Sequence, residues 1–394
     1  MARARIGLCL GVAAALVLLG VVVLGGDEGE GHTRITVGNP WLTRFADSAR
    51  VPRPRPDSGR LVADLVAQRR FGMGVEQAMW TSPLYVVRSD QGLPRRRIYL
   101  RGRAAKRADP RKGARHSGEV LGFLVHRGVH GKGWPLPDDA QPDPSTGLGA
   151  DGHLAILVAD TGQYVELNNA RRLPDGSWTA DWGGYVHDLR TDPGHFRDRF
   201  VRSLAWSHHG WGATGSSLPL YGGLIREGEI RAAVAAYERG DHDAAVIPHA
   251  LGLNTHGHTR YSWVWPAQRT DCYGRGGCTF VPSPIEMGQL FRFPPSFDPR
   301  TVTGPGPRET MLLQIVARTI REYGAIVWDA SGGGFKLRAE LTPGRPMFDY
   351  GDSARWLQAL PLDRLEVVET RGRRGYRPLI PRAHARAATE RLLR

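Results

Sequence analysis

Carboxylate side chains that could act on a glycosidic bond lie between residues 151 and 271 of this sequence. Glu166, Asp181 and Glu229 are the candidate catalytic residues. Cleavage of such a bond needs two carboxyl groups about 5–9 Å apart, one to donate a proton and one to attack or to activate water. If the chain reverses around residue 175, Glu166 and Asp181 fall on neighbouring strands and on one face. This pair, or one of its members with Glu229, is therefore the predicted catalytic set.

The same stretch is rich in tryptophan. Sugar rings present apolar C–H faces that stack on indole, and their hydroxyl groups need polar partners. We therefore predict carbohydrate contacts from Trp182, Trp211, Trp265, His153 and Asp271. The alternative stays open that the tryptophans belong to the core of a β-sheet domain and that the carboxylates form rim salt bridges.

Histidines and serines offer weaker chemistry. The pair His208–His209 and the pair His256 and His258 match no helical or loop spacing for zinc. Ser203 and Ser207 have histidines nearby, but the sequence contains no G-x-S-x-G turn. We expect no metal and no cofactor.

Strands dominate the elements that must position these residues. Turn residues at 160–162 and 174–176 separate three β-rich segments, which predicts an antiparallel meander over 153–158, 163–170 and 177–185. Further strands are expected at 261–265, 290–293, 325–328 and 335–341. In the last of these, Phe335, Leu337 and Ala339 should face inward, and Lys336, Arg338 and Glu340 outward. The predicted fold is mainly β, an antiparallel, jelly-roll-like β-sandwich with a few peripheral α-helices.

Two longer helices and one short helix decorate this fold. Residues 227–239 and 308–323 each place their apolar side chains on one face. Pro307 suits a first helical turn, and Gly324 suits a helix end. A short helix through Leu61 and Leu65 follows a proline-rich stretch at 51–56, with Asp57 or Ser58 as its cap.

The block from residue 151 to about 340 resembles a family of secreted, largely uncharacterised bacterial proteins. The family pattern reads D-x-H, Y-x-E-L, G-x-W, L-P-x-x-x-G-L, H-A-L and W-P-A. This chain carries it as Asp151-Gly-His153, Tyr164-Val-Glu166-Leu167, Gly176-Ser-Trp178, Leu218-Pro219 through Gly223-Leu224, His249-Ala250-Leu251 and Trp265-Pro266-Ala267. Extra residues between Glu229 and His249, and the loop after Asp271, depart from the pattern. The resemblance implies a shared fold and no established activity.

The first residues are typical of a signal anchor or signal peptide. An uncharged run at 6–24 follows Arg3 and Arg5 and precedes Asp27, Glu28 and Glu30. At about 1.5 Å per residue, a helix of this length crosses a hydrocarbon core of about 30 Å. The predicted organisation is a cytoplasmic stub at 1–5, a membrane segment at 6–24, a spacer at 25–50, one β-rich extracytoplasmic domain at 51–382 and a basic tail at 383–394. The protein would be anchored in the plasma membrane or secreted.

Cysteine usage agrees with an oxidising compartment. Cys9 lies in the apolar run, which leaves Cys272 and Cys278 around a short glycine-rich loop. A disulfide is the simplest reading of such a pair outside the cytoplasm. Metal binding by the pair is the rival, and it lacks further ligands at zinc spacing.

The net charge of +14 is partly local, because arginines and lysines crowd residues 95–115 and 371–394. Such patches attract polyanions. In the predicted compartment these polyanions are lipid head groups, wall polymers and acidic polysaccharides rather than nucleic acid. A solvated basic loop is the simpler alternative.

The leading hypothesis is an extracytoplasmic protein that recognises a polysaccharide or other cell-envelope polymer without modifying it. The alternatives are a glycan-cleaving enzyme (hydrolase or lyase) and a structural envelope protein that docks to anionic polymers or lipids.

Overall fold

The chain divides into two compact units, residues 1–33 and 34–394. The computed structural model describes residues 40–47, 52–100, 125–145, 151–196, 208–210, 212–258, 263–270, 283–342 and 355–370, all in the second unit. The predicted membrane segment, Trp211, Asp271, Cys272, Cys278 and the basic tail lie outside the described residues. Within them, no helix combines the length and the hydropathy that a membrane crossing requires. The predicted domain boundaries and the disulfide stay predictions.

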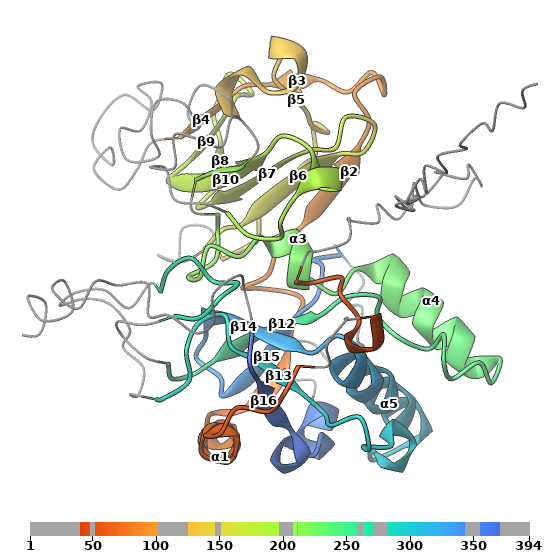
Figure 1. Ribbon diagram of the computed structural model, residues 1–394. Helices are drawn as coiled ribbons and strands as arrows, with labels where there is room; N and C mark the ends of the chain where they lie inside the picture. Colours follow the sequence, from red (N-terminus) through yellow and green to blue (C-terminus); the bar gives the residue numbers. More distant parts are fainter. Residues whose placement is uncertain are drawn as a thin grey trace, which may run out of the picture. The chain divides into compact units, whose positions relative to one another are not determined.

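A six-stranded mixed sheet contains strands from both ends of the second unit (Figure 1). Its order is β1-β15-β12-β14-β13-β16. Two of its pairings, β1 with β15 and β12 with β14, are parallel, and the others are antiparallel. The strands are β1 (Met73–Glu76), β12 (Leu251–Thr255), β13 (Leu290–Arg292), β14 (Ala325–Ala330), β15 (Phe335–Arg338) and β16 (Glu366–Val368).

A five-stranded sheet contains the predicted meander. Its order is β11-β10-β7-β6-β2, formed by β2 (Leu84–Val87), β6 (Leu154–Val158), β7 (Gln163–Asn168), β10 (Trp182–Val186) and β11 (His208–Gly210). The antiparallel pairs of β6 with β7 and of β7 with β10 confirm the meander. The third predicted strand is divided: β9 (Trp178–Ala180) leaves this sheet and pairs with β4 (Ile98–Leu100) and β8 (Arg171–Arg172). A small ribbon joins β3 (Arg95–Arg96) to β5 (Trp134–Pro135).

The predicted helices are present. Helix α1 (Ser58–Gln68) lies against β16, and α4 (Glu227–Glu238) packs beside α5 (Pro307–Glu322), as Figure 1 shows. The buried stripe of α5 includes Leu312, Ile315, Val316 and Ile320, as its period predicts. Gly324 follows with φ of +89°, a left-handed conformation that other residues adopt at a cost. Short helical turns complete the chain: α3 (Leu220–Gly223), η1 (Phe45–Asp47), η2 (Arg69–Phe71), η5 (Val129–Gly131), η6 (Leu189–Thr191), η7 (Pro299–Thr301), η9 (Arg355–Ala359) and η10 (Leu362–Arg364).

Three hydrophobic clusters form the core. The largest lies between the helices and one face of the six-stranded sheet, through residues such as Leu253, Val327 and Leu337. A second covers one face of the five-stranded sheet, and includes Trp134 and Trp178. The third contains residues of both sheets, since Leu157 and Tyr164 pack in one cluster with Ile326 and Trp328. Both faces of the six-stranded sheet are therefore covered.

Parts of the predicted fold need correction. The described protein is β-rich, but its sheets are mixed, because the prediction took sequence-adjacent strands as the only partners and β1–β15, β12–β14, β2–β6 and β4–β9 pair in parallel. No strand covers 263–265, where Trp263 forms an isolated bridge to Met287. Arg338 was expected to face solvent and is instead 2% exposed. Phe335, Leu337 and Ala339 face inward as predicted, but on the face that was assigned to water Arg338 is buried and Lys336 and Glu340 are half-buried.

Candidate functional site

Glu166, the first predicted catalytic residue, is fully buried on β7. Its carboxylate accepts three hydrogen bonds: from the Tyr164 hydroxyl at 2.6 Å, from the Ala213 N–H at 2.5 Å and from the Leu220 N–H at 2.8 Å. Burial raises the pKa of Glu166 to about 7, and these three donors oppose the rise. The carboxylate joins β7 to the loop at 212–220. It has no exposed surface with which to contact a polymer.

Asp181, its predicted partner, lies on the turn before β10 and is 6% exposed. Its carboxylate accepts a hydrogen bond from the Asn169 side chain at 2.9 Å. In the register of β7 and β10, Glu166 faces Gly184 and Asn168 faces Trp182, so these four positions share one side. Asp181 precedes Trp182 by one residue and falls on the other side. The structure does not bring Glu166 and Asp181 together as a pair.

Glu229 lies in the first turn of α4 and is 6% exposed. Its carboxylate pairs with the Arg226 guanidinium and lies 3.0 Å from His249 Nε2. Burial alone would raise the pKa of Glu229, but the charges of Arg226 and His249 lower it below its ordinary value. His249 Nδ1 lies 2.7 Å from the Ala250 carbonyl oxygen, so both of its ring nitrogens face acceptors. Glu229 and His249, between which this chain has extra residues relative to the family pattern, are therefore in contact.

The predicted carbohydrate contacts are scattered. Trp182 and Trp265 are partly exposed, on β10 and on the turn after Val264. His153 is fully buried just before β6. Trp178, which the same argument would have favoured, is a core residue at 1% exposure. Trp211 and Asp271 lie outside the described residues.

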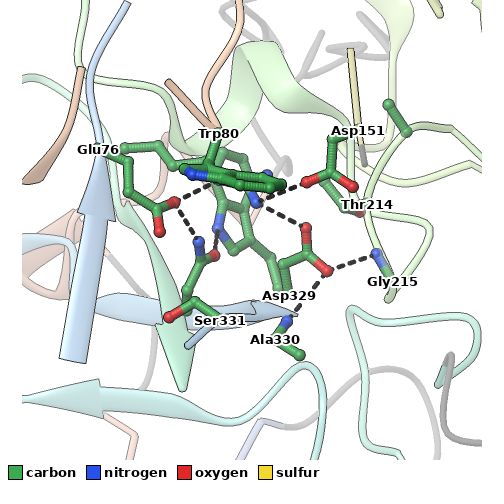
Figure 2. A network of polar contacts seen from close by, with 12 residues as sticks. Glu76, Trp80, Asp151, Thr214, Gly215, Asp329, Ala330 and Ser331 are labelled. Carbon is green, nitrogen blue, oxygen red and sulfur yellow. Dashed lines mark hydrogen bonds and ion pairs between the residues drawn. The ribbon is translucent and has the colours of Figure 1, made fainter. Parts of the chain in front are cut away.

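A buried polar network that the sequence analysis did not identify surrounds Arg338 (Figure 2). Its guanidinium Nε lies 3.1 Å from Glu76, and Nη2 lies 3.0 Å from Asp329 and 3.7 Å from Asp151. Asn254 donates to Glu76 at 2.9 Å and accepts from the Trp328 indole N–H at 2.6 Å. The Gly215 N–H donates to Asp329 at 3.0 Å, which ties the loop at 212–220 to the six-stranded sheet. We call Arg338, Glu76, Asp329, Asp151 and Asn254 the Arg338 network.

Strand pairing places the members of this network. The parallel register of β1 and β15 puts Glu76 directly beside Arg338. A β-bulge between Leu253 and Asn254 shifts the register of β12 against β14, so that Leu253 faces Val327 but Asn254 faces Asp329. Bulges re-aim side chains, and here Trp328 and Asp329, which are consecutive, both contact the network.

Burial and neighbouring charges shift the pKa values of the titratable groups in and beside the Arg338 network. Burial raises the pKa of Glu76 to about 7, although Arg338 and Lys336 favour its charged form. Burial alone would lower the pKa of Arg338, but Asp329, Glu76 and Asp151 raise it above its ordinary value. Burial and the nearby Arg338 charge lower the pKa of His153 to about 4. The imidazole of His153 is therefore neutral at neutral pH.

Trp80 is the exposed aromatic residue beside this network, and Figure 2 shows it together with Glu76 and Asp151. Its side chain is 38% exposed. Its φ of +62° lies in the left-handed region, which bulky residues rarely adopt. The Trp80 N–H donates to Asp143 at 3.3 Å, and Asp143 is fully buried and also accepts from the Ser145 hydroxyl at 2.7 Å. Strain of this kind concentrates at functional sites.

The signals for this site in the sequence were weak. Glu76 and Asp329 end apolar runs in β1 and β14, but such residues are also common at exposed strand ends. Nothing in the sequence marks the conformation of Trp80. Among the described residues, no group of three or more histidine, cysteine or carboxylate side chains is arranged to hold a metal ion.

Comparison with known proteins finds no match among family models, curated proteins or solved structures.

Proposed function

We propose that this protein recognises carbohydrate, and that Trp80 and the Arg338 network form the recognition site. The observation that carries the proposal is the placement of a 38% exposed indole beside a network of buried carboxylates. Asp151 lies at the edge of that network, and its side chain is 37% exposed. An indole face with carboxylate oxygens next to it matches the two surfaces of a sugar ring, its C–H face and its hydroxyl groups.

The backbone of Trp80 supports this choice over the other tryptophans. Left-handed φ values in non-glycine residues destabilise a fold by about 1–2 kcal/mol. Such a conformation persists where the surroundings hold it and where a side chain serves a purpose other than packing. Trp80 has such a conformation at +62°, while Trp182 and Trp265 do not.

The wider setting of the proposal comes from the sequence. We propose an extracytoplasmic location, with the segment at 6–24 as membrane anchor or signal peptide, and a polysaccharide or other envelope polymer as partner. The jelly-roll-like arrangement of the sheets also remains a proposal, supported by the core cluster that contains residues of both sheets. Binding without chemical change is the leading form of the function.

Affinity electrophoresis of the full chain in mild detergent tests the proposal. The chain is run through gels that contain neutral or acidic polysaccharides, beside the variants Trp80→Ala, Trp182→Ala and Trp265→Ala. Retardation that is lost in Trp80→Ala and kept in the other two supports the site. If Trp182→Ala or Trp265→Ala loses retardation and Trp80→Ala keeps it, the site lies elsewhere. Circular dichroism on each variant shows whether it is folded.

A glycan-cleaving enzyme is the second candidate, and the state of Glu76 favours it. A carboxyl group with a pKa of about 7 can donate a proton at neutral pH, as a general acid must. Glu76 and Asp329 contact one guanidinium, at 3.1 and 3.0 Å, so a second carboxyl group lies near Glu76, as glycoside hydrolysis requires. This candidate is supported if the native chain releases new reducing ends from a polysaccharide, and if Glu76→Gln and Asp329→Asn abolish the release but keep the retardation in the gel.

A structural protein that docks to anionic polymers through its basic surface is the third candidate. Its binding would depend on screened attraction, so it would collapse as salt is raised. It would also survive Trp80→Ala. The same gels, run at low and high salt, distinguish this candidate from the proposed one.

A further inference from the structure

Three exposed cations, Arg97, Lys132 and Arg171, lie around the small sheet β4-β9-β8. Figure 1 shows β3, β4 and β5 at the end of this part of the chain that is away from the six-stranded sheet. None of the three cations forms an ion pair with a residue that the structure describes. Their neighbour Arg96, by contrast, pairs with Asp138. The three charges are therefore available to a partner.

Strand pairing places Arg97 and Arg171 on one face of this sheet. Thr179 on β9 pairs with Tyr99 on β4 and with Arg171 on β8, so these three side chains form a row across the sheet. Arg97 precedes Tyr99 by two residues and faces the same side, and its carbonyl oxygen accepts from the Trp178 N–H, which extends the β4–β9 pairing to it. Strands are about 4.8 Å apart and rise about 3.3 Å per residue, so the two arginine Cα atoms are about 12 Å apart.

The loop at 128–133 brings Lys132 next to these arginines. Gly133 packs so closely on the β3 backbone that a Cβ would lie 2.7 Å from a carbonyl oxygen, and its φ of +86° is left-handed. The loop follows His126, whose ring centroid lies 4.8 Å from that of Tyr99. Burial and the charge of Arg97 lower the pKa of His126. The three cations therefore lie on one surface, which we call the β4–β8 surface.

The chemistry of these side chains selects an anionic partner. A guanidinium binds carboxylate and sulfate groups through paired N–H donors, and an ammonium group acts as a point charge. Each exposed contact of this kind contributes little by itself. A polymer that repeats its charge along the chain can make several of these contacts at once, so it gains most from such a surface.

The lack of exposed apolar side chains selects among polyanions. Proteins that dock on a lipid surface insert apolar side chains, and proteins that bind single-stranded nucleic acid stack bases on aromatic rings. Among the described residues, the exposed large hydrophobic side chains are Trp80 and Val86, which lie before and on β2. On the β4–β8 surface, Tyr99 is half-buried and packs against His126. A polyanion that is recognised by its charge alone fits this surface best.

We propose that the β4–β8 surface is a second binding surface, which takes acidic polysaccharides through Arg97, Lys132 and Arg171. It is separate from the site at Trp80 and does not rest on the function proposed for that site. The net charge of +14 attracts acidic polymers to the chain as a whole, and the β4–β8 surface fixes where they bind. Binding there depends on screened attraction, so it weakens as salt is raised.

Two triple variants with the same loss of charge test the proposal. The surface variant carries Arg97→Gln, Lys132→Gln and Arg171→Gln. The control variant carries Arg60→Gln, Arg231→Gln and Arg300→Gln, at positions on α1, α4 and η7 that are 65%, 58% and 68% exposed. Each full chain in mild detergent is titrated with fluorescent polygalacturonate and dextran sulfate over a series of salt concentrations. Circular dichroism shows whether each variant is folded.

The surface variant should bind the acidic polymers about tenfold more weakly at low salt. The slope of log affinity against log salt concentration should also become shallower by about 2, because three fewer cations displace counterions from the polymer. The control variant and Trp80→Ala should keep the affinity and the slope of the native chain.

Other outcomes overturn the proposal. An equal loss of affinity in the control variant would mean that net charge alone binds the polymer. Full affinity in the surface variant, or no binding of either acidic polymer by the native chain, would also refute it. Single-stranded DNA and mixed micelles of the detergent with phosphatidylglycerol serve as competitors. If either displaces polygalacturonate as well as unlabelled polygalacturonate does at equal charge, the assigned class of partner is wrong. None of these results bears on Trp80-dependent retardation by neutral polymers, which tests the proposed function separately.

Discussion

The guanidinium of Arg338 lies 3.0 Å from the carboxylate of Asp329, with both side chains buried. Asp329 also accepts from the Gly215 N–H, so this ion pair connects the six-stranded sheet to the loop at 212–220. Glu166 holds the same loop from the five-stranded sheet through Ala213 and Leu220. Charged contacts from both sheets therefore converge on one segment.

Removal of the arginine should destabilise the protein strongly. Arg338→Met leaves Glu76 and Asp329 buried without their cation, and breaking a buried ion pair in this way lowers the free energy of unfolding by about 3–5 kcal/mol. Urea unfolding followed by tryptophan fluorescence measures the change. The control is Arg231→Met, since Arg231 is 58% exposed and its pair with Glu227 should contribute little. Equal losses in the two variants would contradict the buried role of Arg338.

Glu166 should stabilise the loop at 212–220 rather than act in chemistry. In Glu166→Gln, the amide NH2 must face one of the N–H or O–H donors that now reach the carboxylate, which leaves a buried donor unpaired. We expect a loss of about 1–3 kcal/mol in the free energy of unfolding. Glu238→Gln, at an exposed position near the end of α4, should change little. Full stability of Glu166→Gln would show that the three hydrogen bonds are dispensable.

Stability should depend on pH through Glu76. Its folded-state pKa of about 7 lies above its ordinary value of 4.5, so the folded state binds the proton more tightly than the unfolded chain does. The stabilisation from that proton is present below about pH 4.5 and is lost as pH rises through 7.

Glu76→Gln removes this titration. The native chain loses this stabilisation as pH rises from 5 to 8, and the variant does not. The free energy of unfolding of Glu76→Gln minus that of the native chain should therefore rise by up to about 3 kcal/mol over this range, whatever the difference is at pH 5. Urea unfolding at a series of pH values gives the difference. A difference that is constant over this range would mean that the pKa of Glu76 is not raised.

The strained backbone of Trp80 predicts an inverted preference between alanine and glycine. Because φ is +62°, Trp80→Gly should be about 1 kcal/mol more stable than Trp80→Ala, although both lose the indole. Thermal unfolding of the two variants gives the comparison. At Val86, an exposed position on β2, glycine should instead be the less stable of the two. The same order at both positions would contradict the left-handed conformation.

Local patterns predicted the three longer helices and several strands of the two larger sheets, but they gave no prediction for β1, β2, β12 or β16. The apolar period of α5, with Pro307 before it and Gly324 after it, located the helix to within a residue or two. Turn residues between short β-rich runs located β6 and β7. Both features depend on neighbours within a few positions, which the sequence displays directly.

The candidate site was much less predictable. Glu166, Asp181 and Glu229 attracted attention as carboxylates in a tryptophan-rich stretch, but each is buried and held by neighbours. Glu76 and Arg338 are 262 positions apart, and a parallel pairing that no turn announces brings them together. Trp80 lies in a segment that matched no pattern at all.

The sequence by itself therefore determined where the longer helices and the β6–β7 hairpin form and which of their side chains share a face, because periodicity and turn chemistry are local. Only the tertiary structure decided what covers each face. The alternation in β15 was read correctly, yet Arg338 is buried, because residues of the other sheet and of the loop at 212–220 pack over the side of β15 that was assigned to solvent. Because that side of β15 is covered, Arg338 contacts the carboxylates of Glu76, Asp329 and Asp151 instead of solvent.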